Sequence, residues 1–327
     1  MDLKDVIRYE ADRIDAEMRR DLAETVGVAP LLAEILEYGL FSGGKRVRPL
    51  LTVLCSRLCG RDDEQLYRLA AAFEYLHAAT LFHDDVIDHA DTRRGRMSVV
   101  KRYGRDGAIL AGDFLHAQAM AMVGHHGGVD ALAVFAEATR GMVNGEFLQM
   151  DQCCRADLSE DDYYSIIRGK TALLIGAACQ IGVMFAGGDD RYRSALRAYG
   201  LNLGSAFQVI DDLLDYQGDS HHTGKAVGND LAEGKVTLPL ILALQQAGEK
   251  ERAEVAALIQ DEGRRGESFA VVTRFIEQFG GYQLARRQAE QLAANAVTAL
   301  EPFRRSVDDQ SLHILVQLVQ YVIGRRK

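Results

Sequence analysis

Proline is almost absent from this chain, and that scarcity limits the folds it can adopt. Only Pro30, Pro49, Pro239 and Pro302 occur in 327 residues, and tryptophan is missing altogether. Ala, Leu, Glu, Arg and Gln dominate the composition, and these residues favour helix over strand. The sequence therefore predicts an all-α protein built from long packed helices.

Short glycine-containing segments mark where the predicted helices break. No shift of composition and no low-complexity linker divides the chain, so we expect a single domain over residues 1–327. The clearest predicted helices run from Gln65 to Asp88 and from Tyr192 to Tyr216. The breaks are expected at Gly43-Gly44, Gly104 to Gly107, Gly124 to Gly128, Gly187-Gly188, Gly218 to Gly228, and Gly263 to Gly266.

Two copies of a DDxxD pattern occur far apart in the chain. In each copy the first and last aspartates are four residues apart, so on a helix they lie on one face, one turn apart. Three carboxylates in one turn repel one another unless a divalent cation neutralises them, and Mg²⁺ suits carboxylate oxygens while keeping positions for water or phosphate. The six residues are Asp84, Asp85 and Asp88 of HDDVID, and Asp211, Asp212 and Asp215 of VIDDLLD.

The surroundings of the two motifs favour function over solvated surface. An acidic run on a helix is usually only solvated. Both motifs, however, end largely apolar stretches, AAFEYLHAATLF and LGSAFQVI, which would otherwise be core. If the two helices pack side by side with their acidic ends level, the clusters face each other across a gap that can hold a metal-diphosphate complex.

Two short loops near the first motif carry basic residues. Arginine offers a planar fork for phosphate oxygens, and lysine offers a point charge. Either loop alone could be solvated surface, but their position beside DDxxD indicates phosphate binding. The loops are GGKRVRP, with Lys45, Arg46 and Arg48, and TRRGR, with Arg93, Arg94 and Arg96.

Charge and cysteine content exclude several classes of protein. A formal net charge of −9 argues against bulk nucleic-acid binding. The five cysteines form no CxxC pair, which indicates neither a disulfide framework nor a zinc site and favours a reducing compartment. No apolar run reaches the roughly 20 residues of a transmembrane helix, so a cytoplasmic protein without a transmembrane segment is expected.

An ordered set of motifs carries a family resemblance. GGKRVRP, HDDVIDHADTRRG, GDFL, GKTA, FQVIDDLLDY and GNDLAEGKVTLPL follow one another along the chain. In this set the chain resembles the trans-isoprenyl diphosphate synthases, the head-to-tail prenyltransferases, over almost its whole length. The resemblance implies the isoprenoid synthase fold, in which antiparallel helices surround a central cavity, together with Mg²⁺ as cofactor and a homodimer.

The resemblance also implies a reaction. Isopentenyl diphosphate would be condensed with an allylic diphosphate, which ionises with the help of Mg²⁺ to an allyl cation. Released diphosphate is the favoured base in the family, so no side chain is assigned to the final proton loss. Water would quench the cation, which makes closure of the site a functional need.

Roles for individual residues follow from the resemblance. It implies metal binding by Asp84, Asp88 and Asp211, with Asp85, Asp212 and Asp215 as further ligands or supports. The catalytic set comprises these six aspartates with Lys170 and Lys225. The pocket for isopentenyl diphosphate would contain Lys45, Arg48, His77 and Arg94. The allylic diphosphate would be contacted by Arg93, Lys170, Thr171, Gln208, Lys225 and Lys235. Arg325 to Lys327 resemble a basic tail that folds over the entrance in some members.

Helical spacing supports two of these roles independently. His77 precedes Asp84 by seven residues and shares nearly the same helix face, and Gln208 lies about one turn before the second motif. Two alternatives stay open: His77 could be a satisfied core histidine, and Thr171 could bond back within its own helix. The chain departs from many relatives at Ala226, where they have proline after the lysine, and a looser loop is expected.

Product length is predicted from the residues below the first motif. Ala79 and Thr80 lie about a turn before Asp84, where short-chain relatives commonly place bulky aromatics as a floor. The missing floor predicts a long-chain all-trans polyprenyl diphosphate, with geranylgeranyl or farnesyl diphosphate synthesis as the alternative. More remote hypotheses are a class I terpene cyclase, which needs no second diphosphate pocket, and a non-catalytic partner subunit.

Overall fold

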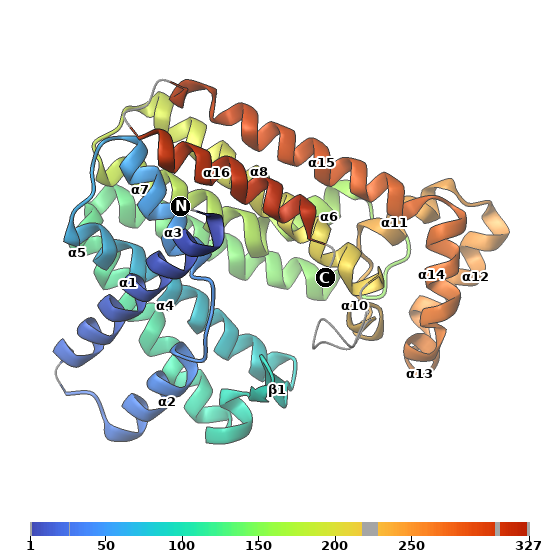
Figure 1. The fold of residues 1–327 in the computed structure, drawn as a ribbon. Coiled ribbons are helices and arrows are strands. Elements are labelled where there is room, and N and C mark those ends of the chain that lie inside the picture. The colour runs from blue at the N-terminus through green and yellow to red at the C-terminus, as the bar shows by residue number, and fades with distance from the viewer. Residues whose placement is uncertain (1, 26, 218–227, 305–307, 326–327) are drawn as a thin grey trace. The chain divides into compact units, whose positions relative to one another are not determined.

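The structure is a computed structural model that describes residues 2–25, 27–217, 228–304 and 308–325. Within these residues nearly all regular structure is helical, as Figure 1 shows, and one two-stranded hairpin is the exception. The prediction of an all-α protein is confirmed.

The chain divides into two compact units. The first comprises Met1–Glu137, Ala177–Arg197 and Pro302–Leu315, and the second comprises Ala138–Gly176, Ala198–Glu301 and Val316–Lys327. Helices α5 (Val99–Asp151), α7 (Leu173–Phe185), α8 (Asp190–Gln217) and α16 (Asp309–Gly324) contribute residues to both units, as does the short η3 (Glu301–Phe303). The single functional domain over residues 1–327 stays a prediction.

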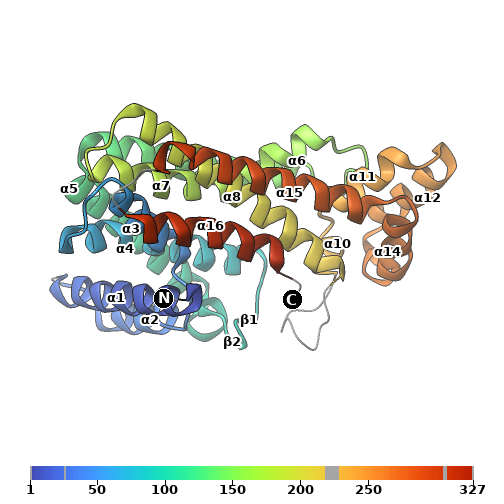
Figure 2. The same cartoon turned by 45° about the horizontal axis from the view of Figure 1, so that its top comes forward.

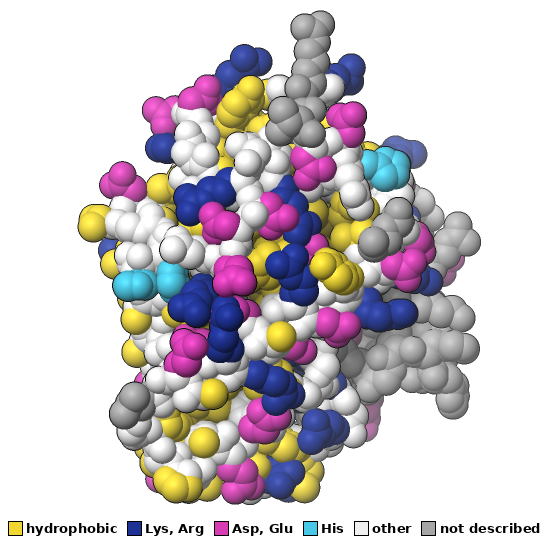
Figure 3. Space-filling model, turned by 60° about the vertical axis from the view of Figure 1, so that its left-hand side comes forward, with side chains coloured by type: hydrophobic (Ala, Val, Ile, Leu, Met, Phe, Trp, Pro, Cys, Tyr) yellow, Lys and Arg dark blue, Asp and Glu magenta, His cyan; other side chains and the backbone are white. Residues whose placement is uncertain are grey.

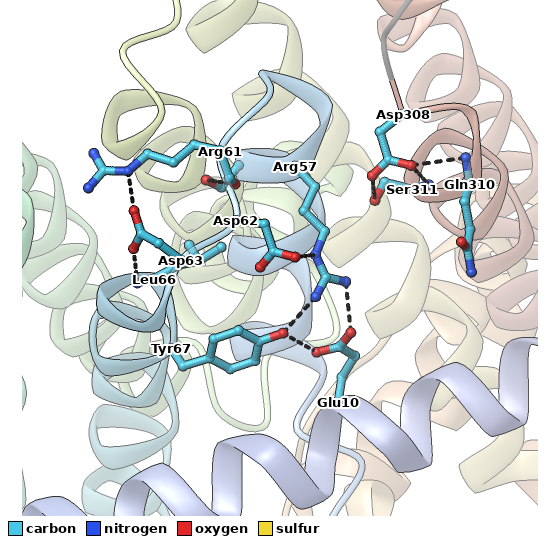
Figure 4. A network of polar contacts seen from close by, with 11 residues as sticks. Glu10, Arg57, Arg61, Asp62, Asp63, Leu66, Tyr67, Asp308, Gln310 and Ser311 are labelled. Atoms are coloured by element: carbon cyan, nitrogen blue, oxygen red, sulfur yellow. Dashed lines mark hydrogen bonds and ion pairs between the residues drawn. The ribbon is translucent and has the colours of Figure 1, made fainter.

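The first unit is built around a buried helix, α4. The elements that lie entirely within this unit are α1 (Leu3–Glu24), α2 (Pro30–Leu40), α3 (Val47–Leu58), α4 (Glu64–Ile87), β1 (Thr92–Arg93) and β2 (Arg96–Met97). Arg19 of α1 pairs with Glu37 of α2, and Figure 2 shows both helices on the same side of α3 and α4. Figure 4 shows how α1, α3 and α4 are tied together, because the buried Glu10 carboxylate accepts from both Arg57 and the Tyr67 hydroxyl.

The second unit gathers the later helices. The elements that lie entirely within this unit are α6 (Glu160–Ile167), the π-helical turn η1 (Arg168–Ala172), α10 (Asn229–Ala232), α11 (Leu238–Gln246), α12 (Glu249–Gln260), α13 (Glu262–Arg265), η2 (Gly266–Ser268), α14 (Phe269–Gln278) and α15 (Gly281–Ala299). Helices α12, α13 and α14 lie together in Figures 1 and 2. Near the chain end, Arg286 of α15 donates to the carbonyl of Ile323 in α16 at 2.6 Å.

Helix α4 begins and ends where the sequence predicts. The Asp63 carboxylate caps its N-terminus by accepting from the amide of Leu66 at 3.2 Å. The helix is buried on most of its faces, as expected of a helix that is apolar almost all round. It ends at Ile87 with Asp88 as the C-cap, so the predicted helix from Gln65 to Asp88 is confirmed.

The second predicted long helix and several predicted breaks are also confirmed. Helix α8 covers the expected stretch from Tyr192 to Tyr216 with two more residues at its start and one at its end. Helix α5 is kinked where Gly104 and Gly128 adopt positive φ angles of 83° and 81°. These two positions fall within predicted breaks and need the conformational freedom of glycine.

Candidate active site

The first aspartate motif occupies the last turn of α4. Asp85 is buried, Asp84 is half-buried and Asp88 is exposed. A helix C-terminus already carries partial negative charge, so carboxylates there are unfavourable without a cation. The last turn of α4 contains no basic residue. The end of α4 therefore concentrates negative charge that a nearby cation would neutralise.

Arg93 fixes the buried member of this motif. Its Nε donates to Asp85 Oδ1 at 2.7 Å. Burial raises the pKa of the Asp85 carboxyl, and the adjacent Arg93 charge offsets only part of that rise. Arg93 lies in the β1–β2 hairpin, whose central residues Arg94 and Gly95 both have positive φ, as a type I′ turn requires. The hairpin thus presents two consecutive arginines beside the acidic end of α4.

Arg48, His77 and Arg94 form a basic cluster within the first unit. Arg48 Nε is buried and has no hydrogen-bond partner in the described structure. The pKa of His77 lies well below its ordinary value because of burial and the positive charges of Arg48 and Arg94, so the ring is neutral. A guanidinium with a buried donor that is not used within the protein is arranged to receive an anion. Lys45 of the same predicted set is exposed.

Arg46 has a different role from its neighbours in the GGKRVRP loop. It is only 4% exposed and donates to Asp15, Glu74 and the carbonyl of Leu40 at 2.6–2.7 Å. The Arg46 charge is therefore neutralised by the carboxylates of Asp15 and Glu74 within the protein. Arg46 adopts a positive φ of 47° at the start of α3, which fixes the loop that carries Lys45.

The second aspartate motif lies in the last turns of α8, which also lack a basic residue. Asp211 is half-buried, and its Oδ1 accepts from Arg325 Nη2 at 3.1 Å. Asp215 Oδ2 accepts from the amide of Asp230 at 3.2 Å. The Arg325 guanidinium, at the end of the described chain, therefore provides a positive charge next to the carboxylate of Asp211.

Asp212 is the buried member of the second motif. Its two oxygens accept from the Tyr163 hydroxyl at 2.5 Å and from Gln208 Nε2 at 2.9 Å. Thr171 donates to Gln208 in turn at 3.1 Å, so it does not bond back within its own helix. Burial and the nearby Asp230 raise the pKa of Asp212 to about 8. Burial and Asp215 raise the pKa of Asp230 to about 6.

A cavity of about 150 Å³ lies beside Asp212, entirely within the second unit. We call it the lysine cavity, because Lys170 and Lys235 both line it. Lys170 pairs with Glu146 at 2.6 Å and donates to Gln149 at 3.0 Å. The remaining polar lining includes Tyr163, Gln208, Asp212 and Asp230. The lysine cavity thus combines two cations with the buried Asp212 and the half-buried Asp230, an arrangement suited to a metal-bound anion.

Lys170 and Thr171 are presented by the π-helical turn η1, which packs against α5 through glycines. A Cβ on Gly169 would lie 2.8 Å from Gly145 Cα and 2.9 Å from the carbonyl of Gly141. These backbone atoms cannot move independently of their helices. Short π segments inside helices occur frequently at functional sites, and here the glycine contact sets where Lys170 projects.

Substitution of Gly169 by alanine is expected to lower the free energy of unfolding by about 1–3 kcal/mol through overpacking. It should also displace Lys170. Chemical denaturation measures the first effect. Gly266→Ala is the matched control, because a Cβ at Gly266 meets no atom within 4 Å, and it should change stability by less than about 0.5 kcal/mol. Equal stabilities for the two variants would contradict the proposed tight contact.

The predicted site residues fall into three groups. Within the first unit the structure brings Arg48, Arg93 and Arg94 around His77 of α4, and Arg93 also reaches Asp85 in the last turn of that helix. Within the second it brings Lys170, Gln208, Asp212 and Lys235 to one cavity. Lys225 lies outside the described residues. Whether the two motifs face each other stays a prediction.

Three residues beside the predicted ones escaped the sequence reasoning. Tyr163 and Asp230 line the lysine cavity, and Glu146 pairs with Lys170, which also lines it. Asp230 belongs to the quoted GNDLAEGK segment and could have been chosen as a carboxylate near Lys235. The positions of Tyr163 and Glu146 depend on the packing of α6 and α5, which no local pattern signals.

One stretch of the described chain, Glu160–Phe185, is long and apolar enough to cross a membrane. Within its most apolar window, 78% is buried inside the protein, as in the core helix of a globular protein. Figure 3 shows Lys and Arg side chains interspersed with Asp and Glu over the visible face.

Comparison with known proteins identifies the class. A family model described as "Polyprenyl synthetase" matches residues 29–276. Octaprenyl diphosphate synthase of Escherichia coli (strain K12) is 36% identical over 292 residues, which cover 88% of this chain and 90% of that protein. The chain belongs to the polyprenyl synthetase family.

Solved structures agree with this assignment. A decaprenyl diphosphate synthase from Rhodobacter capsulatus superposes with a TM-score of 0.91 at 32% identity, covering 99% of this chain and 98% of that one. A polyprenyl synthase from Caulobacter crescentus CB15, complexed with calcium and isoprenyl diphosphate, gives 0.90 at 34%, covering 100% and 98%. The predicted isoprenoid synthase fold and the prediction of a prenyl-transferring enzyme are confirmed.

Proposed function

We propose that this enzyme condenses isopentenyl diphosphate with an allylic diphosphate, head to tail, to give a long-chain all-trans polyprenyl diphosphate. The observation that carries the proposal is that two acidic helix ends are each accompanied by their own basic residues. Arg93 pairs with Asp85 at the end of α4 and shares one basic cluster with Arg48, His77 and Arg94. The lysine cavity lies beside Asp212 at the end of α8. Two diphosphate substrates require two such basic sets. A class I terpene cyclase would need only one.

Mg²⁺ fits the available donors. Asp84, Asp88 and Asp211 offer accessible carboxylate oxygens, whereas Asp85 and Asp212 are buried and held by side-chain hydrogen bonds. Among the residues described, no group of three or more acidic, histidine or cysteine side chains is close enough to hold a metal alone. Mg²⁺ commonly takes one or two carboxylates and completes its shell with water and substrate phosphates. When bound, it would neutralise charge on the departing diphosphate.

The chain's own residues would bind and orient the substrates. Arg48 and Arg94, with Lys45, would hold the diphosphate of isopentenyl diphosphate, and neutral His77 can donate a hydrogen bond without adding charge. Lys170, Thr171 and Lys235 would hold the allylic diphosphate, with Arg93, Gln208 and Lys225 as further contacts. Each cation placed before the reaction stabilises charge that develops as the allylic C–O bond breaks. We assign no side chain as the base.

The proposal is tested by incubating the enzyme with Mg²⁺, labelled isopentenyl diphosphate and a choice of allylic primers, and measuring product length by chromatography. A long all-trans product supports the proposal. A product of 15 or 20 carbons would indicate the alternative of farnesyl or geranylgeranyl synthesis. A cyclic hydrocarbon from the allylic substrate alone would indicate a cyclase, and activity that appears only with a second protein would indicate a partner subunit.

Product length provides a sharper prediction at Ala79. This residue is 2% exposed and lies about one turn before Asp84 on α4. Ala79→Phe should shorten the main product by at least one five-carbon unit, because the ring would close the space in which the chain grows. Ala70→Phe is the control, since Ala70 is equally buried but lies on the opposite face of the same helix. Unchanged product length in a folded Ala79→Phe variant would refute the role of Ala79 and Thr80.

We propose a cytoplasmic homodimer as the working form. Val143, Phe147 and Met150 of α5 are each more than half exposed and follow helical spacing along one face. An exposed apolar stripe of this kind favours burial against a second copy. Sedimentation analysis of the purified enzyme tests the dimer.

A further inference from the structure

Two adjacent thiols lie just beyond the end of α5. Cys153 Sγ and Cys154 Sγ are 3.4 Å apart. Cys154 adopts a left-handed backbone with a φ of 63°, which is uncommon for a residue other than glycine. Cys153 is exposed and Cys154 is half-buried, whereas Cys55 and Cys179 are buried. Cys153 and Cys154 are therefore two thiols placed together where a small reagent can reach them.

Both cysteines are bonded to the segment that supplies Lys235. The Cys153 thiol donates to the carbonyl of Glu233 at 3.3 Å, and the Cys154 amide donates to the carbonyl of Gly234 at 2.8 Å. A Cβ on Gly234 would lie within 3 Å of both sulfurs. The Lys235 amide in turn donates to the carbonyl of Asp230 at 2.8 Å. A change at the thiols is thus transmitted directly to the backbone of Lys235.

Cys153 also lines the lysine cavity, together with Lys170 and Lys235. We propose that Cys153 and Cys154 are a peroxide-sensitive thiol pair whose oxidation to a disulfide displaces Lys235 and weakens allylic diphosphate binding. In this step two thiols lose two protons and two electrons and form one S–S bond, while one peroxide molecule is reduced to two molecules of water. The effect on substrate binding rests on the proposed function; the thiol chemistry does not.

The short distance between the two consecutive Cα atoms makes a Cys153–Cys154 disulfide easy to reduce. Consecutive Cα atoms are about 3.8 Å apart, closer than the roughly 4.4–6.8 Å usual between disulfide-bonded residues. Strained, exposed disulfides are easily reduced, and transient ones of this kind occur in reducing compartments. The thiolate is the reacting species. Burial and the neighbouring Cys154 raise the pKa of Cys153, while Arg265 and Lys235 oppose the rise, so oxidation should quicken as pH increases above neutral.

The experiment treats the intact enzyme with limiting hydrogen peroxide and measures mass, thiol positions and activity on the same samples. The wild-type mass should fall by two hydrogens, and peptide mapping after unfolding without reductant should show Cys153 and Cys154 alone protected from alkylation. The KM for the allylic diphosphate should rise with the fraction of enzyme that carries the disulfide, and it should be about tenfold higher when oxidation is complete. Dithiothreitol should restore both values. Cys154→Ser should have ordinary activity before treatment and should never lose the two hydrogens.

Several outcomes would overturn the proposal. Oxygen addition without hydrogen loss in the wild type, or a disulfide mapped to other cysteines, would exclude the pair. A Cys153–Cys154 disulfide with unchanged KM would exclude its effect on Lys235. Untreated enzyme without prenyl transfer would refute the proposed function instead, and the mass and mapping results would still decide whether the thiol pair exists.

Discussion

Replacing Asp84 with alanine is expected to lower kcat by about three orders of magnitude, equivalent to roughly 4 kcal/mol of transition-state stabilisation. Asp84 is half-buried at the C-terminal end of α4, where the helix itself contributes partial negative charge. We therefore expect its carboxylate to contribute little to the free energy of unfolding and much to the binding of Mg²⁺. Steady-state kinetics over a range of Mg²⁺ concentrations, with stability measured in parallel, tests this expectation. The Mg²⁺ concentration for half-maximal activity should rise.

Asp91→Ala is the matched control for this prediction. Asp91 lies seven residues further on, is exposed, and pairs with Lys101 at 2.9 Å. Its loss should change kcat by less than about twofold, because exposed ion pairs contribute little. Wild-type kinetics in a folded Asp84→Ala variant would contradict the assignment of the first motif, whatever the product of the wild-type enzyme.

The largest effect on stability is expected from Arg46→Met, which should lower the free energy of unfolding by about 3–5 kcal/mol. The substitution leaves Glu74, which is 4% exposed, without its ion-pair partner and removes a donor from the carbonyl of Leu40. A buried carboxylate without its counterion is costly. Urea denaturation with comparison of midpoints and slopes measures the change.

Two further variants test the cause. Arg19→Met removes an ion pair to Glu37 whose side chains are both more than half exposed, and it should cost less than about 1 kcal/mol. Combining Arg46→Met with Glu74→Met should recover much of the lost stability, because the buried charge disappears with its partner. A double variant no more stable than Arg46→Met alone would show that packing, and not the unpaired carboxylate, causes the loss.

Sequence reasoning predicted the parts of this fold that are encoded locally. The ends of α4 and α8 follow from apolar stretches that stop at clusters of aspartate, and the kinks at Gly104 and Gly128 follow from residues that favour left-handed backbone. The π-helical turn at Lys170 was not predicted. It lies where Gly169 packs closely against Gly145, a residue distant from it in sequence. Local patterns cannot register such a contact.

The same distinction holds for the candidate site. Motif order gave Asp212 and Gln208 their roles, but the Tyr163 hydroxyl that fixes Asp212 comes from another helix. Likewise, three basic residues of the GGKRVRP loop look alike in sequence. Only the hydrogen bonds of the folded chain distinguish Arg46, which pairs with Glu74 and Asp15, from Arg48, whose Nε is left without a hydrogen-bond partner.

The contact between Arg325 and Asp211 affects how the second aspartate motif would bind a metal ion. A guanidinium already resides against the carboxylate on which a divalent ion would settle, and it also stacks 4.7 Å from the ring of Phe207. A metal ion that binds this carboxylate oxygen would therefore replace the Arg325 guanidinium as its counterion. We expect the Arg325 guanidinium, once a metal ion displaces it from Asp211, to pair with an anionic group of the substrate.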